Sequence, residues 1–419
     1  MKEQFVGIDT VIDALLEYIQ VWYLGPELLT RPIIVNLWGM TGVGKTDLVR
    51  KLVKFLDFQD RFAEVELSNV DSTSWISSVT ETLERQELND GKPSIVLFDE
   101  IQRFNTLDSE GKPLPQNKFT DFWELLSDGK LAKKSKDDLD HYIMAFQMNA
   151  RDVARRKAKG EADVDDNPMV DNWDARTLKR ALRLDDAVTD MSSMSQRDMM
   201  ELITREKKKK VIYEPVNHQQ TLIIISGNLD EAFEMADQSS EADVDADIFH
   251  AYTKKITDVD IKNALAKKFR PEQVARFGNI HLIYTSLKKA DFEALIANEI
   301  ARITRRTHDR FDIILGVDST INALIYRNGV FPVQGVRPVF STIINVLETH
   351  LAKLVLMALR AKANTITIRH DAGASHIHAR VGTKALAIPY AGRIDKIRSK
   401  NLALLWQICN FGIPKRPEL

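Results

Sequence analysis

The stretch Gly39-Met40-Thr41-Gly42-Val43-Gly44-Lys45-Thr46 decides how the rest of the chain is interpreted. It fits the pattern G-x-x-x-x-G-K-[ST], in which glycines allow backbone N–H groups to surround phosphate oxygens. The apolar residues 32–38 before it predict a buried strand, and residues 47–56 after it have the apolar spacing of a helix. A helix that begins at the loop directs its partial positive charge at a bound anion. The stretch therefore predicts a nucleotide site, in which Lys45 reaches the β- and γ-phosphates and Thr46 helps to hold Mg²⁺.

Length and composition limit the classes of protein to which the chain can belong. Its 419 residues are too many for one compact core, and a formal net charge of −2 gives no general attraction to nucleic acid or anionic membranes. The single cysteine, Cys409, excludes an intrachain disulfide framework and a cysteine-rich zinc site. The first residues lack the apolar core of a signal peptide, and no run of about 18 apolar residues is present. We therefore expect a cytoplasmic protein without a membrane segment.

Four further segments predict strands that join the one before the glycine-rich loop. They are residues 62–67, 94–98, 221–225 and 280–284. Several of them lack polar alternation, and helical segments separate them, which is the pattern of a parallel sheet covered on both faces. We therefore expect an α/β fold, in which ligands bind at the carboxyl ends of the strands.

Two of these strands end in polar residues suited to phosphoryl transfer. Asp99 and Glu100 follow residues 94–98. We expect Asp99 to act on the Mg²⁺ shell and Glu100 to polarise the water that attacks the γ-phosphate. Asn228 follows the strand 221–225 and would position that water or contact the γ-phosphate, although the same residue also suits a turn before Asp230.

Residues 131–215 interrupt the alternation of strands and helices. The segment is densely charged with both signs and contains seven of the 11 methionines. Methionine-rich helices form adaptable contact surfaces, but the same residues can pack a small core of the insert, and the sequence leaves both interpretations open. We interpret Lys207–Lys210 as a solvated helix end because acidic residues balance the segment.

From Lys288 onward the pattern changes to a smaller helical unit. Residues 292–303 and 339–362 predict helices, and short strands are predicted at 311–315, 365–368 and 376–380. His376 and His378 alternate along the last strand as a metal-binding pair would. Because no acidic residue or third histidine lies near them in the sequence, we interpret them as strand surface residues.

Several segments, in order along residues 5–382, resemble the C-terminal ATPase module of the Clp unfoldases and disaggregases, which are AAA+ ATPases. The segment with Arg270 and Arg276 resembles the family's arginine-finger segment, and the segment with Arg337 resembles its sensor-2 motif. These two matches are more specific than the glycine-rich loop, because few other nucleoside triphosphatases carry both at these places. Val336 stands where the family usually has alanine. The matching segments are Phe5-Val6-Gly7-Ile8-Asp9, Val96-Leu97-Phe98-Asp99-Glu100-Ile101, Ile224-Ile225-Ser226-Gly227-Asn228-Leu229, Phe269-Arg270-Pro271-Glu272 with Arg276, and Gly335-Val336-Arg337-Pro338.

The resemblance implies a domain plan and a set of site residues. It implies an AAA+ domain over residues 1–287, with five parallel strands in the order 5-1-4-3-2 and an insert at about 132–215. A small C-terminal α+β lid domain over 288–382 and an extension over 383–419 follow. Glu100, Asn228, Arg276 and Arg337 would act in catalysis, with Arg276 offered to a neighbouring subunit and Arg337 supplied by the lid. The residues implied to contact ATP are Val6, Ile8, Gly39, Thr41, Gly42, Val43, Gly44, Lys45, Thr46, Asp47, Asp99 and Arg270, of which Thr46 and Asp99 would serve Mg²⁺.

By this resemblance we expect an ATP-hydrolysing enzyme that remodels protein partners in an oligomeric ring, a hexamer in the family. Clp unfoldases have an aromatic pore loop flanked by glycines, whereas Trp75 is the only aromatic residue within residues 66–93, so threading of a client is not predicted. One alternative is a nucleic-acid-associated switch, suggested by Arg151, Arg155, Arg156, Lys157 and Lys207–Lys210. Another is a slow regulatory ATPase subunit that recruits a partner through the insert.

Overall fold

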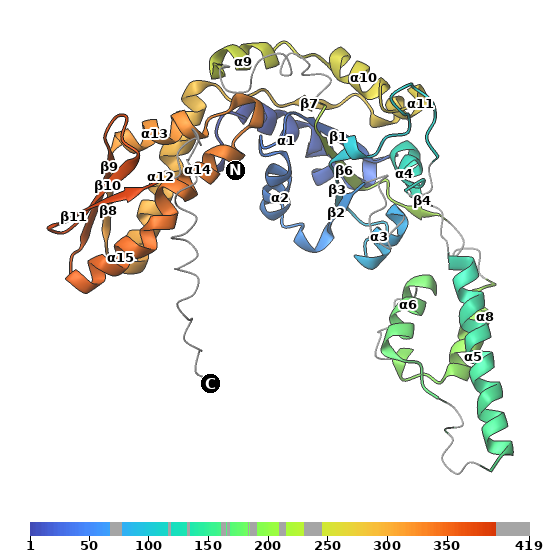
Figure 1. Ribbon diagram of the computed structural model, residues 1–419. Helices are drawn as coiled ribbons and strands as arrows, with labels where there is room; N and C mark the ends of the chain where they lie inside the picture. Colours follow the sequence, from blue (N-terminus) through green and yellow to red (C-terminus); the bar gives the residue numbers. More distant parts are fainter. Residues whose placement is uncertain are drawn as a thin grey trace. The chain divides into compact units, whose positions relative to one another are not determined.

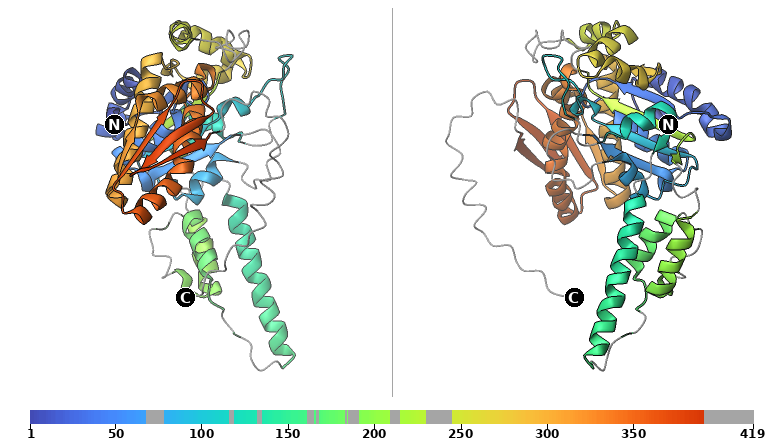
Figure 2. Two further views of the ribbon diagram at one scale, coloured as in Figure 1. Left: turned by 60° about the vertical axis from the view of Figure 1, so that its left-hand side comes forward. Right: turned by 90° about the vertical axis from the view of Figure 1, so that its right-hand side faces the viewer.

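The computed structural model describes residues 1–67, 78–115, 119–131, 135–160, 165, 168–182, 184, 191–208, 215–229 and 245–390. The chain forms two compact units. The first comprises Met1–Ser239 and His250–Ser286, and the second comprises Ser240–Phe249 and Leu287–Leu419. Figure 1 and Figure 2 show the helices and strands of both units. Trp75, the one aromatic candidate for a pore loop, lies outside the described residues.

A five-stranded parallel sheet forms the centre of the first unit (Figure 1). Its strands, in spatial order, are β2 (Phe62–Glu66), β3 (Ser94–Asp99), β6 (Thr221–Gly227), β1 (Ile33–Trp38) and β7 (His281–Ile283). Counted along the chain within this sheet, the order is 5-1-4-3-2, so the predicted fold class is confirmed. All pairings are parallel, and the carboxyl ends of the strands therefore share one edge of the sheet.

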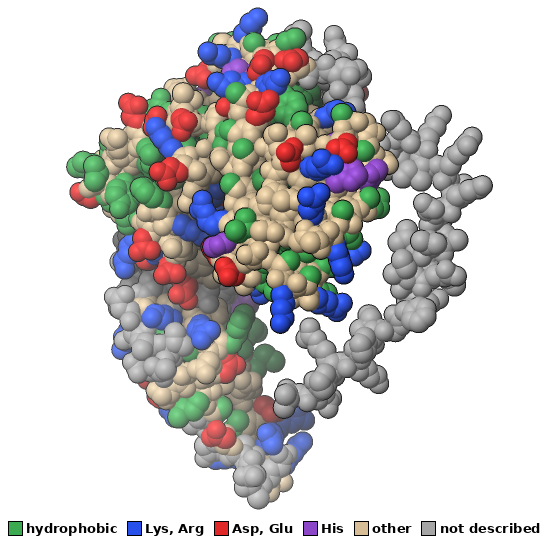
Figure 3. Space-filling model, turned by 90° about the vertical axis from the view of Figure 1, so that its left-hand side faces the viewer, with side chains coloured by type: hydrophobic (Ala, Val, Ile, Leu, Met, Phe, Trp, Pro, Cys, Tyr) green, Lys and Arg blue, Asp and Glu red, His purple; other side chains and the backbone are tan. Residues whose placement is uncertain are grey.

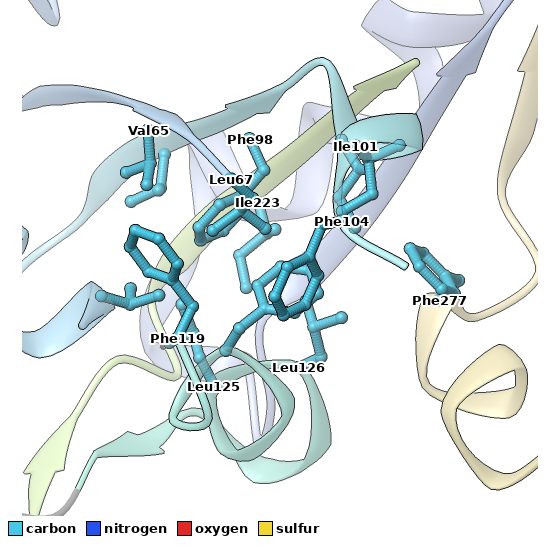
Figure 4. Close-up of a cluster of buried hydrophobic side chains, with 14 of the residues drawn as sticks. Val65, Leu67, Phe98, Ile101, Phe104, Phe119, Leu125, Leu126, Ile223 and Phe277 are labelled. Carbon is cyan, nitrogen blue, oxygen red and sulfur yellow. The ribbon is translucent and has the colours of Figure 1, made fainter. Parts of the chain in front are cut away.

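Helices cover both faces of this sheet, because alternate residues of the apolar strands point to opposite sides. On one face α1 (Asp9–Leu24) and α2 (Lys45–Phe55) pack against Val35, Ile95 and Ile224. On the other face α3 (Val79–Arg85), α4 (Phe122–Asp128) and α10 (Asp258–Ala266) pack against strand residues. Figure 4 shows part of this second cluster, in which Phe104, Phe119, Leu125 and Leu126 lie against Val65, Phe98 and Ile223.

Aromatic side chains fill much of that second face. The rings of Phe98 and Phe122 meet edge to face with centroids 4.8 Å apart, and Trp123 meets Phe122 at 4.9 Å and Phe277 at 5.8 Å. Such pairs contribute about 0.5–1.5 kcal/mol each beyond the burial of their surface. They attach the segment that carries Arg276 to the sheet. The remaining short elements of the unit are η1 (Lys2–Gln4), η2 (Pro26–Leu28), η3 (Gln59–Arg61), η4 (Ile101–Arg103), α11 (Pro271–Val274), η7 (Ala275–Phe277) and α9 (Ala246–Thr253), which also contributes to the second unit.

The insert predicted between the third and fourth strands is a helical element with a core of its own. It contains α5 (Ser135–Ala158), α6 (Asn172–Leu182) and α8 (Gln196–Glu206). The chain enters it through β4 (Lys130–Leu131) and leaves it through β5 (Val216–Asn217), and these two strands pair antiparallel. The core interpretation of its methionines applies to some of them, and the contact-surface interpretation stays a prediction. Met191 and Met199 are buried in the core, whereas Met144, Met148 and Met169 are at least 60% exposed.

The second unit combines helices with a four-stranded sheet. The helices are α12 (Lys289–Phe311), α13 (Ser319–Gly329), η8 (Pro332–Gln334), α14 (Arg337–Ile343) and α15 (Thr349–Ala361), the last two joined by the π turn η9 (Ile344–Glu348). The strands lie in the order β11 (Lys384–Pro389), β10 (His376–Val381), β9 (Thr365–His370) and β8 (Ile314–Val317). Only β8 and β9 pair in parallel.

Two strands of this sheet differ from the prediction. The strand expected at 311–315 begins at Ile314, because α12 continues through Phe311 and ends where Asp312 adopts a left-handed conformation with φ 54°. Strand β11 was not predicted at all, and it extends the sheet to Pro389, beyond the expected lid boundary at residue 382.

The continuous helix Arg337–Ala361 is long and apolar enough to cross a membrane by length and composition alone. Its apolar residues have another use in this fold. Val339, Ile343, Leu347 and Leu354 are buried in the core of the second unit, and 33% of the most apolar 18-residue window of the helix is buried.

Candidate nucleotide site

The glycine-rich loop joins β1 to α2 in a conformation that requires its glycines. Gly42 and Gly44 have φ values of 79° and 90°, which L-residues with a side chain rarely adopt. A Cβ atom at Gly39 would lie only 2.7 Å from Cβ of the fully buried Tyr284. Each glycine is thus set by the backbone path, and the path leads directly into the first turn of α2.

Lys45 and Asn228 connect this loop to the end of β6. The ammonium of Lys45 donates to the carbonyls of Gly39 at 2.7 Å and Met40 at 2.9 Å, and to Oδ1 of Asn228 at 2.7 Å. The amide Nδ2 of Asn228 donates to the Thr41 hydroxyl at 2.5 Å. Both Lys45 and Asn228 are at most 9% exposed. The structure therefore places Asn228 directly against the predicted phosphate loop.

Thr46 and Asp99 bring the start of α2 to the end of β3. The hydroxyl of Thr46 donates to Oδ2 of Asp99 at 2.7 Å. A hydroxyl and a carboxylate are the oxygen donors that Mg²⁺ takes from a protein when phosphates and water supply the rest of its shell. Within the described ranges no cluster of three or more His, Cys, Asp or Glu side chains can hold a metal by itself. This pair fits a metal that arrives with a nucleotide. Asp47, also predicted for this site, instead forms an exposed ion pair with Lys51 at 2.9 Å.

Glu100 follows Asp99 in a left-handed conformation with φ 56° and ψ 37°. Asp99 Oδ1 accepts a hydrogen bond from the Glu100 backbone N–H at 2.9 Å, which stabilises this uncommon turn. The Glu100 carboxylate accepts from Nε2 of Gln102 at 2.6 Å and lies 3.5 Å from Nε of Arg103. Sequence reasoning missed Gln102 and Arg103. Their only signal is their place two and three residues after Glu100.

The segment over residues 5–9, which resembles the family's first matching segment, lies next to the glycine-rich loop. Ile8 is 4% exposed and belongs to the apolar cluster that also includes Phe5 and Val43. Lys51 of α2 places its ammonium 4.1 Å from the centre of the Phe5 ring. Val6, between these residues, is half-buried. The segment that opens the chain thus packs against the helix that follows the P-loop.

The three predicted arginines lie in different surroundings. Arg276, in η7, is half-buried and donates from Nη1 to the carbonyl of Trp123 at 2.9 Å. Arg270 precedes α11, and its Nε is buried without a hydrogen-bond partner among the described residues. Arg337 begins α14 in the second unit and is exposed. The roles of all three arginines in the site stay predictions.

The rings of His281 and Tyr284 lie in or directly after β7, the strand beside β1. Nε1 of Trp38 donates to Nδ1 of His281 at 2.9 Å, so this nitrogen acts as an acceptor, and burial lowers the pKa of the His281 imidazole. Burial raises the pKa of Tyr284, the residue against Gly39. Neither ring adds a charge beneath the loop.

A cavity of the described residues lies away from this site. It has a volume of about 880 Å³ and lies between α12 and α15 in the second unit. Its walls include Ile303, Phe311, Leu351 and Val355, and none of the predicted site residues contributes to it. The nucleotide site is identified by its loop geometry and polar contacts rather than by cavity size.

Two family models match the chain. Residues 35–134 match the ATPase family associated with various cellular activities (AAA), and residues 287–368 match the C-terminal, D2-small domain of ClpB protein. The chain carries a Clp-like AAA+ ATPase module. The first match spans the P-loop and the Asp99–Glu100 pair, and the second begins where the second compact unit resumes at Leu287. For this AAA+ module the family implies nucleotide binding.

Individual relatives of the module agree with these matches. The chain is 26% identical over 153 residues to the chaperone protein ClpB of Lactiplantibacillus plantarum, which is 36% of this chain and 16% of that protein. It is 29% identical over 113 residues to chaperone protein ClpB 1 of Parasynechococcus marenigrum, 27% of this chain and 13% of the relative. The matches thus span about one-sixth or less of the length of these relatives. The structural alignment with a closed-state cryo-EM reconstruction of Hsp104 with ATPγS and FITC casein covers 86% of this chain and 47% of the Hsp104 chain. Its TM-score is 0.47 and the sequence identity is 15%.

Proposed function

We propose that this chain is a Mg²⁺-dependent ATPase that remodels protein partners as part of a ring oligomer. The observation that carries the proposal is the convergence of two strand ends on the P-loop. Lys45 meets Asn228 at 2.7 Å, and Thr46 meets Asp99 at 2.7 Å. These contacts join the loop to the ends of β6 and β3, where a parallel sheet binds its ligands.

In this proposal the residues of the loop hold the nucleotide. The backbone N–H groups at the start of α2 and the ammonium of Lys45 bind phosphate oxygens. Thr46 and Asp99 hold Mg²⁺, which when bound neutralises charge on the β- and γ-phosphates. Asn228 contacts the γ-phosphate from the end of β6. Glu100 accepts the proton of the attacking water, since its carboxylate stands one residue beyond Asp99 at the same strand end.

Arg276 is proposed to complete the site of a neighbouring subunit. Its hydrogen bond to Trp123 uses one of five guanidinium N–H donors, so the residue is anchored while other donors can bind phosphate. An arginine supplied in this way is worth about 10³–10⁵ in rate in related phosphoryl transfers. The proposal requires an oligomer, because the arginine and the P-loop come from different copies. Arg337 in the second unit is proposed as a further phosphate contact.

A mixing experiment tests hydrolysis and assembly together. When each variant is assayed by itself, Arg276→Ala and Glu100→Gln are expected to release little phosphate from ATP. A mixture of the two contains sites with an intact Glu100 on one subunit and an intact Arg276 on its neighbour, so activity should return. Arg85→Ala, which removes an exposed arginine of α3 paired with Glu81, is the control and should retain full activity. Mixtures that stay inactive while both variants assemble normally would contradict the arginine's role between subunits.

The insert is the segment best suited to recruit a protein partner. The helices that the structure describes in the insert are folded around their own core, yet Met144, Met148 and Trp173 are 62%, 62% and 75% exposed. Exposed methionine and tryptophan side chains are typical of protein contact surfaces. An element with a separate core and exposed apolar residues favours recruitment of a partner over a purely internal role.

The base of the insert permits a clean deletion. Leu131 pairs with Val216, so residues 132–215 can be replaced by Asn-Gly, a two-residue turn that suits antiparallel strands. The shortened protein should keep its ATPase activity and lose partner binding. If it binds partners as the full chain does, the insert is not the recruiting element.

Charge distribution favours protein over nucleic acid as the partner. On the face shown in Figure 3, basic and acidic side chains are interspersed rather than gathered by sign. In the insert, Lys207 forms an ion pair with Asp140, and Arg205 forms one with Glu206. These acidic partners offset part of the basic run that suggests nucleic-acid binding.

A further inference from the structure

Gln102 lies between two residues of the nucleotide site and contacts both. Its Oε1 accepts a hydrogen bond from the backbone N–H of Asn228 at 2.9 Å. Its Nε2 donates to Oε2 of Glu100 at 2.6 Å. One half-buried side chain in η4 thus connects the end of β6 to the carboxylate at the end of β3.

The chemistry of these two partners requires an amide. A backbone N–H can only donate and a carboxylate can only accept, so the side chain between them must present an acceptor on one side and a donor on the other. This requirement also fixes which way the amide of Gln102 is oriented. A glutamate of the same length would keep the bond to Asn228 but would set a second carboxylate against Glu100. A methionine of similar shape would lose both bonds.

The close approach of η4 to β6 is built into the backbone. A Cβ atom at Gly227 would lie 2.5 Å from Cγ2 of Ile101 and 3.1 Å from Oε1 of Gln102. Gly227 therefore lets the strand end come within hydrogen-bond distance of the Gln102 side chain. Arg103 is a cation near Glu100, but it is 55% exposed and also pairs with Glu66 at 2.6 Å. Solvent screens that pair, so Gln102 is the stronger constraint on Glu100.

We propose that Gln102 is a positioning residue that links the P-loop to Glu100. The proposal rests on the proposed function, in which Glu100 activates the attacking water. The side chain of Asn228 contacts Lys45 and Thr41, and its backbone N–H contacts Gln102. A shift of Asn228 toward a bound γ-phosphate is therefore transmitted through one amide to the carboxylate. Gln102 itself touches neither nucleotide nor water in this scheme.

Three protein variants, compared in one ATPase assay, test the link between Gln102 and Glu100. Gln102→Glu keeps the acceptor for Asn228 and removes the donor to Glu100, and Gln102→Met removes both. For both variants we expect kcat for ATP to fall about tenfold or more, the loss expected for a hydrogen bond to a charged group, while KM changes less than about threefold. In Gln102→Glu the acidic limb of the pH–kcat profile should also move to higher pH, because a neighbouring carboxylate disfavours the ionised form of Glu100. Gln20→Glu, an exposed substitution on α1, is the charge-matched control and should resemble the wild type.

The outcomes separate this inference from the proposed function. If Glu100→Gln abolishes turnover but both Gln102 variants keep kcat within about twofold, Gln102 does not position Glu100 and the proposed hydrolytic site stands. If Gln102→Glu lowers kcat through a lower melting temperature, with an unchanged acidic limb, its role is structural and the inference is wrong. If Glu100→Gln still hydrolyses ATP at the wild-type rate, the proposed function fails first. Lower kcat at unchanged melting temperature, with the acidic limb displaced, supports the link.

Discussion

The ammonium of Lys45 and the side-chain oxygen of Asn228 are 183 residues apart in the chain and 2.7 Å apart in space. The parallel pairing of β1 with β6 produces this contact, because it sets Trp38 opposite Gly227 and so brings the residues after both strands to the same edge. A charged hydrogen bond between buried partners is worth about 1.5–3 kcal/mol. The contact therefore couples the loop to the strand end across the sheet.

Asn228→Ala removes the side chain that contacts both Lys45 and Thr41. We expect kcat for ATP to fall about 10–100-fold, with a smaller effect on the dissociation constant of ATP, because a γ-phosphate contact stabilises the transition state more than the bound substrate. Steady-state phosphate release and fluorescent-nucleotide titration measure the two quantities. Asn149→Ala, on the exposed face of α5, is the matched control. Equal loss in binding and turnover would instead indicate that Asn228 contributes general binding.

Thr46→Val and Thr46→Ser separate the hydroxyl of Thr46 from its shape. Valine keeps the branched side chain but cannot bind a metal or donate to Asp99, whereas serine keeps the hydroxyl. We expect the Mg²⁺ concentration for half-maximal ATPase activity to rise about tenfold or more in Thr46→Val and to stay near the wild-type value in Thr46→Ser. The same Mg²⁺ dependence in all three proteins would be incompatible with a metal-binding role for Thr46.

His218 should make the stability of the first unit depend on pH. Burial lowers its pKa from 6.5 to about 4, because the ring, 2% exposed, disfavours the charged form. Because the pKa is lower in the folded state, the contribution of the neutral His218 ring to the free energy of unfolding is fully present above pH 6.5. It is lost as pH falls toward 4. The loss amounts to about 3 kcal/mol over that interval.

Urea unfolding at several pH values measures this effect. In His218→Gln the free energy of unfolding should fall less steeply between pH 6.5 and 4 than in the wild type. His141→Gln, which replaces an exposed histidine of α5, is the control and should keep the wild-type slope. A wild-type slope in His218→Gln would mean that other groups govern the acid sensitivity.

The sequence predicted the first unit well because its signals are local. Five apolar strands, each bounded by turn or polar residues, are recognisable without contacts, and the P-loop supplies a motif with a fixed place between strand and helix. Strand β11 was missed because Ala385-Leu386-Ala387-Ile388 is a short apolar run, which periodicity alone does not assign to a strand. The start of β8 was misplaced because Phe311 closes α12 rather than opening a strand.

Side-chain contacts that depend on the conformation of a turn could not be predicted from the sequence. The bond from Gln102 to Glu100 depends on the left-handed turn at Glu100, and nothing in the residue types requires that turn. The acidic neighbour of the histidine pair was hidden for the same reason. Asp371 lies 3.1 Å from Nε2 of His378 although it is seven residues away, because the β9–β10 turn folds it back.

Turnover by Glu100→Gln tests whether Glu100 activates the water that hydrolyses ATP. The substitution removes the carboxylate and keeps an isosteric side chain, so the P-loop, Thr46 and Asp99 stay in place. We expect ATP binding within about threefold of the wild type and phosphate release slower by about 10²–10⁴-fold, the usual contribution of general base catalysis. Glu27→Gln, an exposed carboxylate in η2, should release phosphate at the wild-type rate. An unchanged rate of phosphate release from Glu100→Gln would contradict the assignment of this residue and the hydrolytic site built around it.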